Sequence, residues 1–205
     1  MIPLRTGERP DTILLLVGLL FVAATAIPSS VGAARPNIVF IMTDQQSADV
    51  MSCRMGNQYI STPAMDSLAK TGTVFTRAYA PNPLCMPARN SIFTGRYPHE
   101  TGVTKNGRPP GGSLAPEFVC MGTYFREAGY ATAYSGKWHL CLPVRDTDRH
   151  GFRILDSKTR LEPPADDNYD SRVAHAAVEF LREDQERPFL LVVSFMNPHN
   201  ICEWA

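Results

Sequence analysis

The sequence predicts an α/β protein with a mostly parallel sheet flanked by helices. Strand-like and helix-like segments alternate from residue 35 onward, and the strand-like segments at residues 37–42 and 189–195 are apolar throughout or nearly so. Strands without polar alternation are typical of parallel sheets that helices cover on both faces. We therefore expect the strand at residues 37–42 to be buried on both faces.

Local signals place the elements between these two strands. A helix is predicted over residues 63–70, because Thr62 can cap its start, Pro63 suits its first turn and Gly72 ends it. The other expected elements are a strand over residues 73–79, a helix over 87–93 closed by Gly95, a helix over 118–128, a strand over 130–134 and a helix over 170–183. The polar stretch 146–167 is expected to be an irregular surface excursion.

Length and charge exclude several classes of protein. The chain has 205 residues, with 20 Lys and Arg against 20 Asp and Glu, and 44% of its residues are hydrophobic. That composition excludes an intrinsically disordered chain and is long enough for one domain with a real core. The balanced charge argues against a nucleic-acid partner, since such proteins carry a basic excess or stripe.

The N-terminus resembles a secretory signal. Arg5 and Arg9 precede an apolar run of fourteen residues, 13–26, and small residues follow it. A helix needs about 20 apolar residues to cross a bilayer, so we expect no stable membrane span. We expect a signal peptide over residues 1–33, with residues 34–205 secreted, periplasmic or lysosomal. An uncleaved anchor and a buried core helix are the alternatives.

The five cysteines form no metal or redox motif. Cys53, Cys85, Cys120, Cys141 and Cys202 are widely spaced, without any C-x-x-C pair. A zinc site and a thioredoxin-type motif are therefore unsupported. In an oxidising compartment an odd number leaves one cysteine over, which invites a special role for it.

Reactive side chains follow several of the predicted strands. In parallel α/β sheets, ligands bind outside the carboxyl ends of the strands. The residues at those positions are Asp44 and Gln45 after the first strand, Lys137 and His139 after the strand at 130–134, and Asn197 and His199 after the last. The remaining histidines, His99, His150 and His175, are interpreted as structural or surface residues.

A predicted helix start adds a thiol and a guanidinium. Pro87 favours a helix beginning near Cys85, and Arg89 lies one helical turn further on. Unpaired N–H groups at a helix start attract an anion, and the planar fork of arginine suits a tetrahedral oxyanion. A buried cysteine beside an unrelated surface arginine is the alternative interpretation. Four segments that deliver reactive groups to one rim are better explained by an active site.

The residues around Cys85 resemble a family signature. The string Cys85-Met-Pro-Ala-Arg-Asn-Ser-Ile-Phe-Thr-Gly-Arg96 is similar to the signature of the type I sulfatases, formylglycine-dependent enzymes of the alkaline phosphatase superfamily. The resemblance continues, in order, in residues 35–45, 62–69, 136–140 and 197–199. It implies an alkaline-phosphatase-like fold, represented by its N-terminal part and truncated before the C-terminal part.

The resemblance also implies a modified residue and a metal. A formylglycine-generating enzyme would convert Cys85 to formylglycine, whose hydrated diol attacks the sulfur of a sulfate ester and then breaks down to release sulfate. Asp44, Gln45 and the modified Cys85 would be ligands of one divalent cation, usually Ca²⁺, which prefers oxygen donors. Many relatives carry a second Asp at the position of Gln45, and Gln still offers an oxygen.

Four further residues receive roles from the resemblance. Arg89 and Lys137 would neutralise charge on the sulfuryl group and the diol. His139 would assist the breakdown of the diol, and His199 would protonate the leaving oxygen. These residue types suit the chemistry, because attack on an anionic ester needs cations and an alkoxide leaving group needs a proton.

The predicted function is therefore that of a sulfuric ester hydrolase acting on a sulfate-ester small molecule or a sulfated carbohydrate. A phosphonate or phosphate ester hydrolase of the same superfamily is one alternative, and an inactive truncated pseudoenzyme acting as a binding module is another. In the family, later residues supply further metal ligands, another lysine and a C-terminal subdomain. We therefore expect the 205-residue chain alone to be inactive or poorly folded.

Overall fold

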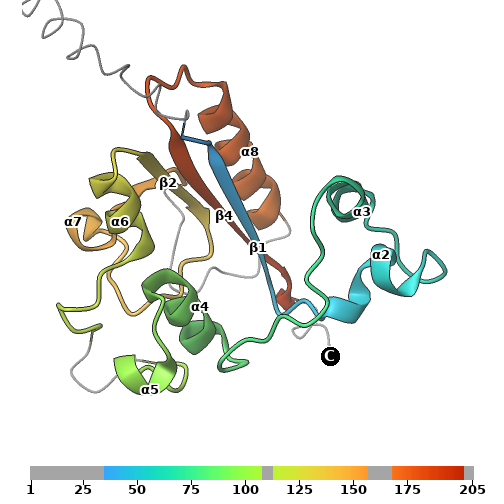
Figure 1. The fold of residues 1–205 in the computed structure, drawn as a ribbon, viewed down its shortest axis with the longest axis horizontal. Coiled ribbons are helices and arrows are strands. Elements are labelled where there is room, and N and C mark those ends of the chain that lie inside the picture. Colours follow the sequence, from blue (N-terminus) through green and yellow to red (C-terminus); the bar gives the residue numbers. More distant parts are fainter. Residues whose placement is uncertain (1–34, 108–112, 157–167, 201–205) are drawn as a thin grey trace, which may run out of the picture. The chain divides into compact units, whose positions relative to one another are not determined.

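The computed structural model describes residues 35–107, 113–156 and 168–200. All its elements lie in one compact unit, Pro36–Ala205 (Figure 1). In chain order they are β1 (Ile38–Asp44), η1 (Ala48–Val50), α2 (Ser52–Met55), α3 (Pro63–Thr71), α4 (Cys85–Thr94), α5 (Pro98–Thr101), α6 (Met121–Glu127), β2 (Ala131–Gly136), α7 (Thr147–His150), β3 (Arg153–Ile154), α8 (Tyr169–Arg182) and β4 (Phe189–Pro198). The predicted signal peptide, residues 1–33, lies outside the described residues. In the described part of the chain, no helix combines the length and apolar character that crossing a membrane requires.

The strands form one parallel sheet in the order β1-β4-β2-β3. Register pairs Phe40 with Val192 and Val192 with Tyr134, so these three side chains share one face of the sheet. Ala133 and Leu191 share the opposite face. Every strand of this sheet runs in the same direction, so the carboxyl ends of β1, β2 and β4 lie along one edge. The predicted α/β class is confirmed.

A core lies on each face of the sheet. On one face, Phe93 of α4 and Met86 pack with Tyr134, Trp138 and Val192. On the other face, α8 contributes Tyr169, Val173, Ala177 and Phe180 against Leu191 and Val193. Helices therefore cover both faces of β2 and β4, and these strands are buried along nearly their whole length.

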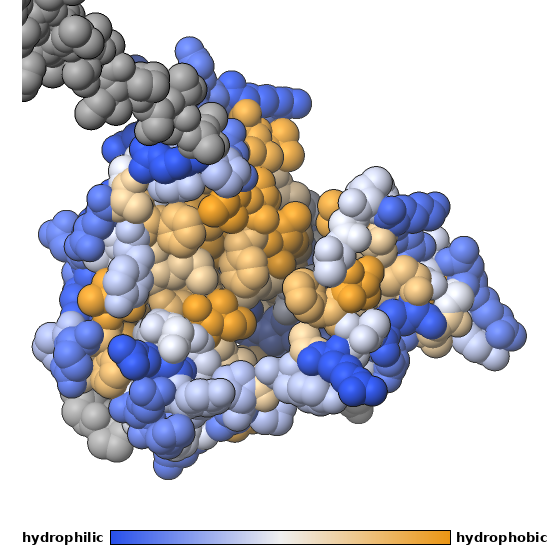
Figure 2. All heavy atoms as spheres, viewed as in Figure 1, coloured by the Kyte–Doolittle hydropathy of each residue, from blue (hydrophilic) through white to orange (hydrophobic). Residues whose placement is uncertain are grey.

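Strand β1 lies at an edge and is covered on one face. Phe40 packs toward the core beneath α4, but Val39 and Ile41 are 46% and 55% exposed. The prediction that this strand is buried on both faces is therefore wrong for one face, the one on which α8 packs against β4. Hydrophobic residues gather on the surface over the part of the sheet where β1 lies (Figure 2). An apolar run predicts a strand, but it does not predict whether other elements cover one face of that strand or both.

Most predicted elements are confirmed, and two segments differ. Residues 73–79 form no strand: all are exposed and lie in the loop before α4. The stretch 146–167 was expected to be irregular, but α7 and β3 form within it, and His150 and Phe152 are buried. Residues 157–167 of that stretch lie outside the described residues. The four described cysteines, Cys53, Cys85, Cys120 and Cys141, are free thiols.

His150 is a structural histidine whose two ring nitrogens both make hydrogen bonds. Nε2 lies 2.9 Å from the Val144 carbonyl oxygen, and Nδ1 accepts from the Phe152 N–H at 3.1 Å. The ring therefore has to be neutral, with its proton on Nε2, because protonation of Nδ1 would set two donors against each other. Burial lowers the pKa of His150 below its ordinary value.

We expect acid to destabilise the protein through His150. Below about pH 6.5 the unfolded chain binds a proton that the folded chain excludes, so stability falls as pH falls, by at most about 1.4 kcal/mol per pH unit. Urea denaturation at about pH 7.5 and about pH 5.5 measures the drop, which should shrink in His150→Gln because glutamine does not titrate. The variant of the exposed His175, His175→Gln, serves as control and should show the drop of the unsubstituted protein. An unchanged drop in His150→Gln would contradict the assignment.

Candidate active site

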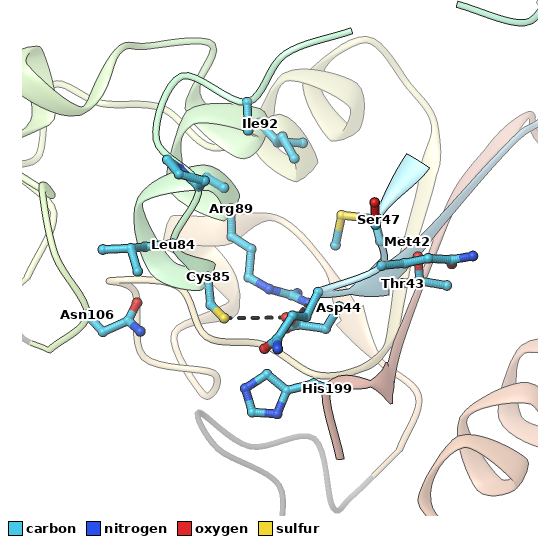
Figure 3. Close-up of a pocket in the computed structure, with 15 residues that line it drawn as sticks. Met42, Thr43, Asp44, Ser47, Leu84, Cys85, Arg89, Ile92, Asn106 and His199 are labelled. Carbon is cyan, nitrogen blue, oxygen red and sulfur yellow. Dashed lines mark hydrogen bonds and ion pairs between the residues drawn. The ribbon is translucent and has the colours of Figure 1, made fainter. Parts of the chain in front are cut away.

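Four elements bring reactive side chains together at the carboxyl edge of the sheet. β1 ends at Asp44, Lys137 follows the last residue of β2, His199 follows the last residue of β4, and α4 begins at Cys85. Cys85, Arg89 and His199 point toward Asp44 in the close-up (Figure 3). A cavity of about 560 Å³ opens here, and Asp44, Cys85, Arg89 and His199 are among its lining residues.

Gly136 turns the chain at the end of β2 so that Lys137 enters this cluster. Its φ of +105° lies in the region that favours glycine. A Cβ at this position would lie 2.0 Å from the Ser194 carbonyl oxygen of the neighbouring strand. Only glycine fits the close approach of β2 to β4 at this point. The turn is therefore built into the sequence directly before the lysine.

Asp44 lies between two buried cations. Its Oδ2 atom is 2.6 Å from Lys137 Nζ and 3.0 Å from Arg89 Nη2. Lys137 is 2% exposed and Asp44 is 5% exposed in their side chains. Burial alone would raise the pKa of Asp44, but the hydrogen bond from Lys137 and the charges of Arg89 and Lys137 outweigh it and hold the pKa below its ordinary value. One carboxylate against two cations leaves this buried cluster with net positive charge.

Arg89 is fixed by contacts that the sequence did not reveal. Its Nη1 donates to the Lys137 carbonyl oxygen at 2.9 Å and to Ser194 Oγ at 2.8 Å. The hydroxyl of Tyr134 also donates to the Lys137 carbonyl, at 2.5 Å. Ser194 lies on β4 and Tyr134 on β2, both fully buried. These residues sit inside apolar strands, and no motif marks them as part of the site.

Cys85 is the first residue of α4, with Leu84 as its N-cap. The predicted helix start near Cys85 is thus confirmed, and the helix itself begins two residues before the predicted range of 87–93. Its Sγ donates to Asp44 Oδ1 at 3.3 Å and lies 4.0 Å from Lys137 Nζ. Burial raises the pKa of the Cys85 thiol, and the charge of Asp44 raises it further, against the opposing effect of Lys137 and Arg89. An unmodified Cys85 is therefore a protonated thiol and a weak nucleophile.

Asn106 is a cavity residue that sequence reasoning missed. Its Oδ1 accepts the backbone N–H of Met86 at 3.1 Å, next to Cys85. The amide side chain thereby satisfies one of the free N–H groups at the start of α4 and also lines the cavity. An Asn placed in a loop is a weak signal, which explains why the sequence did not single it out.

The other predicted site residues lie at different depths. A ring nitrogen of His199 lies within 4.8 Å of ligand atoms of Asp44 and Cys85. The Nδ1 of His199 is buried and has no hydrogen-bond partner among the described residues. Gln45 is exposed and lines the cavity, with a φ of +62°. His139 is buried, has a φ of +44°, and is not among the described residues that line the cavity.

The donor set fits a hard divalent cation in part. Asp44 and Gln45 offer a carboxylate and an amide oxygen, which such cations prefer. Asp44, Cys85 and His199 form a group with ligand atoms close enough to share one ion. Oδ2 of Asp44 already pairs with two cations, whereas Oδ1 accepts from Cys85 Sγ and would be the carboxylate oxygen offered to a metal. Further oxygen ligands would be needed to complete a calcium shell of six to eight.

The same arrangement suits an anion strongly. A net positive, buried cluster attracts a negatively charged ester and stabilises the additional charge that develops when a nucleophile attacks it. The planar guanidinium of Arg89 and the point charge of Lys137 converge on the region beside Cys85. His199 faces the same region and can carry a proton. The geometry supports transfer of a sulfuryl or phosphoryl group to a nucleophile at position 85.

Comparison with known proteins identifies the family. The family model described as Sulfatase matches residues 36–204. The chain is 33% identical over 198 residues to an uncharacterized sulfatase of Escherichia coli, which covers 81% of this chain and 39% of that protein. It is 33% identical over 208 residues to an N-acetylglucosamine-6-O-sulfatase of Bacteroides thetaiotaomicron, covering 94% of this chain and 36% of the relative.

Solved structures agree with the predicted fold. One, in complex with its substrate D-glucosamine-2-N,6-O-disulfate, has a TM-score of 0.65 at 32% identity, over 80% of this chain and 35% of that one. The structural neighbours are sulfatases, which confirms the expected alkaline-phosphatase-like α/β architecture. The chain spans between about a third and two fifths of the length of these relatives. It belongs to the sulfatase family.

Proposed function

We propose that the protein hydrolyses sulfate monoesters at the cavity beside Cys85. The observation that carries this proposal is the contact of Cys85 Sγ with the buried cluster of Asp44, Lys137 and Arg89 in a member of the sulfatase family. The net positive charge of the cluster suits a sulfate ester, and the family supplies the reaction type. The phosphonate or phosphate ester alternative has no comparable support.

Each charged residue of the site has a distinct role in the proposed reaction. Lys137 and Arg89 bind the sulfuryl group and offset its negative charge. His199, whose ring faces Asp44 and Cys85, delivers a proton to the leaving oxygen. Asp44 orients both cations through its Oδ2 atom. For His139, assistance in the breakdown of the diol is a proposal that rests on the family resemblance alone.

A modified residue and a metal complete the proposal. Formylglycine at position 85, formed by a formylglycine-generating enzyme, supplies the nucleophilic oxygen that the protonated thiol does not offer. A divalent cation, which we propose to be Ca²⁺, supplies a positive charge that lowers the pKa of that oxygen, with Asp44 and Gln45 as ligands from this chain. The basic and apolar N-terminus supports maturation in a secretory, periplasmic or lysosomal compartment.

The substrate class that we propose is a sulfated carbohydrate. Support comes from the N-acetylglucosamine-6-O-sulfatase and from the solved relative that holds D-glucosamine-2-N,6-O-disulfate, each more than 30% identical to this chain. Gln45 lines the cavity and is exposed to solvent, and we propose that the sugar attached to the sulfate lies on this side.

A substrate panel tests the function. The complete gene product that contains this chain is assayed, with formylglycine-generating activity in the host, on glucosamine 6-sulfate, an aryl sulfate, an aryl phosphonate and an aryl phosphate. We expect turnover of the sulfates to exceed turnover of the phosphorus esters. Preference for the phosphonate or phosphate would overturn the sulfatase proposal, and absence of all turnover would favour a pseudoenzyme that only binds anions.

A further inference from the structure

A carboxylate on α8 holds the end of β4 just before His199. Asp170 Oδ1 accepts the backbone N–H of Met196 at 2.7 Å. Its Oδ2 accepts the backbone N–H of Asn197 at 2.9 Å and the Asn197 side-chain amide at 2.8 Å. One side chain therefore satisfies three donors on the two residues that precede Pro198 and His199.

This carboxylate is itself fixed relative to the sheet. Asp170 lies in the first turn of α8, between the buried Tyr169 and the buried Val173. Both of those side chains belong to the core that α8 forms against Leu191 and Val193 of β4. Ser135 of β2 also donates to the Val173 carbonyl at 3.0 Å. The start of α8 is thus fixed against the two central strands, and Asp170 in turn holds the end of β4 in a fixed position relative to α8.

The acceptor in these three contacts is a charged carboxylate, partly buried toward Met196 and exposed toward Asn197. Hydrogen bonds to a carboxylate are roughly twice as strong as those between neutral groups, and three of them converge on Asp170. Because Asp170 binds the backbone N–H groups of both Met196 and Asn197, the peptide units that lead to His199 have little freedom to move. A shift of even about 1 Å in a reacting group can cost about 10²-fold in rate.

We propose that Asp170 is a positioning residue for His199. It holds the end of β4 so that the imidazole stays beside Asp44 and Cys85, where it can protonate the leaving oxygen. This inference rests on the proposed function, since it assigns the device that orients its proton donor. Without the carboxylate, the reaction loses proton delivery selectively, while Arg89 and Lys137 still bind the sulfuryl group.

Two aryl sulfates of similar size distinguish a loss of proton delivery to the leaving group from a general loss of folded or active enzyme. The phenol released from 4-nitrophenyl sulfate leaves as an anion at neutral pH, whereas the more basic phenol released from 4-methylphenyl sulfate benefits from a proton. Asp170→Ala in the complete gene product should reduce kcat/KM, which reports the step that releases the phenol, for the 4-methylphenyl ester by about 10-fold or more beyond its effect on the 4-nitrophenyl ester, because a general acid typically supplies 10²- to 10⁴-fold. The ratio of the two rates does not depend on the fraction of enzyme that folds.

Further variants sharpen the test. His199→Ala should change the same ratio in the same direction, and Asp170→Ala added to it should change the ratio no further. Asp170→Asn, which sets an amide donor against one of the N–H groups, should show a shift of the same sign. Asp184→Asn is the matched control, because Asp184 is an exposed carboxylate just beyond the opposite end of α8.

The outcomes distinguish the two levels of the proposal. If the unsubstituted protein turns over neither these aryl sulfates nor glucosamine 6-sulfate, the proposed function is wrong and the positioning role is wrong with it. If it turns over both, and Asp170→Ala slows both equally, Asp170 stabilises the fold without positioning His199. A selective loss with the poorer leaving group, absent in Asp184→Asn, supports the assignment.

Discussion

Cys85→Ala is expected to abolish sulfate-ester hydrolysis in the complete gene product. The Sγ atom that touches Asp44 at 3.3 Å marks where the reacting oxygen has to be formed, and alanine leaves no atom there. Loss of a covalent nucleophile costs on the order of 10⁴-fold or more in kcat. The substitution should leave the fold intact, because Cys85 is only half-buried and alanine suits a helix. Turnover of an aryl sulfate, with circular dichroism as a check on folding, measures both.

The matched control is Cys53→Ala. Cys53 is another free thiol, exposed in α2 and outside the cavity beside Asp44. We expect Cys53→Ala to retain the activity of the unsubstituted protein. Equal activity in Cys85→Ala and Cys53→Ala would remove Cys85 from the mechanism.

Lys137→Met is expected to reduce kcat/KM by about 10²- to 10³-fold, the range seen when one donor that stabilises developing negative charge is removed. Methionine matches the length of the buried lysine stem and removes the charge 2.6 Å from Asp44. The cluster then holds one carboxylate and one cation, so its attraction for an anionic ester falls. The pKa of Asp44 should rise, because the hydrogen bond and the charge of Lys137 both lower it.

Stability should fall less than activity in Lys137→Met. Arg89 still pairs with Asp44 at 3.0 Å, so the carboxylate keeps one partner. We expect a loss of about 1–3 kcal/mol in the free energy of unfolding, the usual cost of a buried polar group left partly unsatisfied. The exposed lysine of α3 gives the control Lys70→Met, which should change neither quantity. Activity within about threefold of the unsubstituted protein would contradict a role for Lys137 in binding the sulfuryl group.

Much of the fold could be predicted because its strongest signals are local. The strand that ends at Asp44 and the strand at residues 189–195 are long apolar runs, and Gly95 ends α4 as predicted. Residues 73–79 show the limit of such signals. Val74 and Phe75 favour strands, but no strand in the described part of the chain pairs with this segment, and its residues are exposed.

Short elements escaped prediction for a related reason. β3 contains two residues, Arg153 and Ile154, which are too few to show any periodicity. Its existence depends on pairing with β2, and the buried His150 just before it is fixed by backbone partners. Neither the pairing nor these partners can be read from a polar stretch of sequence.

The site residues at the ends of the strands could be predicted from the sequence, whereas the supporting residues within the strands could not. Asp44 ends one strand, Lys137 and His199 directly follow two others, and parallel strands bring such positions to one edge. Ser194 and Tyr134, which hold Arg89 and the Lys137 backbone, lie within strands and carry no motif. Asp170 reaches the end of β4 from a helix 26 residues earlier, which only the folded chain reveals.

The most direct test of the central claim is the chemical state of residue 85. Mass spectrometry of the peptide that contains Cys85, from protein made in a host with formylglycine-generating activity, should show an aldehyde in place of the thiol. The peptide that contains Cys53 serves as the unmodified reference. Sulfatase activity per molecule should rise in proportion to the converted fraction. Full activity in protein whose Cys85 is entirely an unmodified thiol would contradict the account.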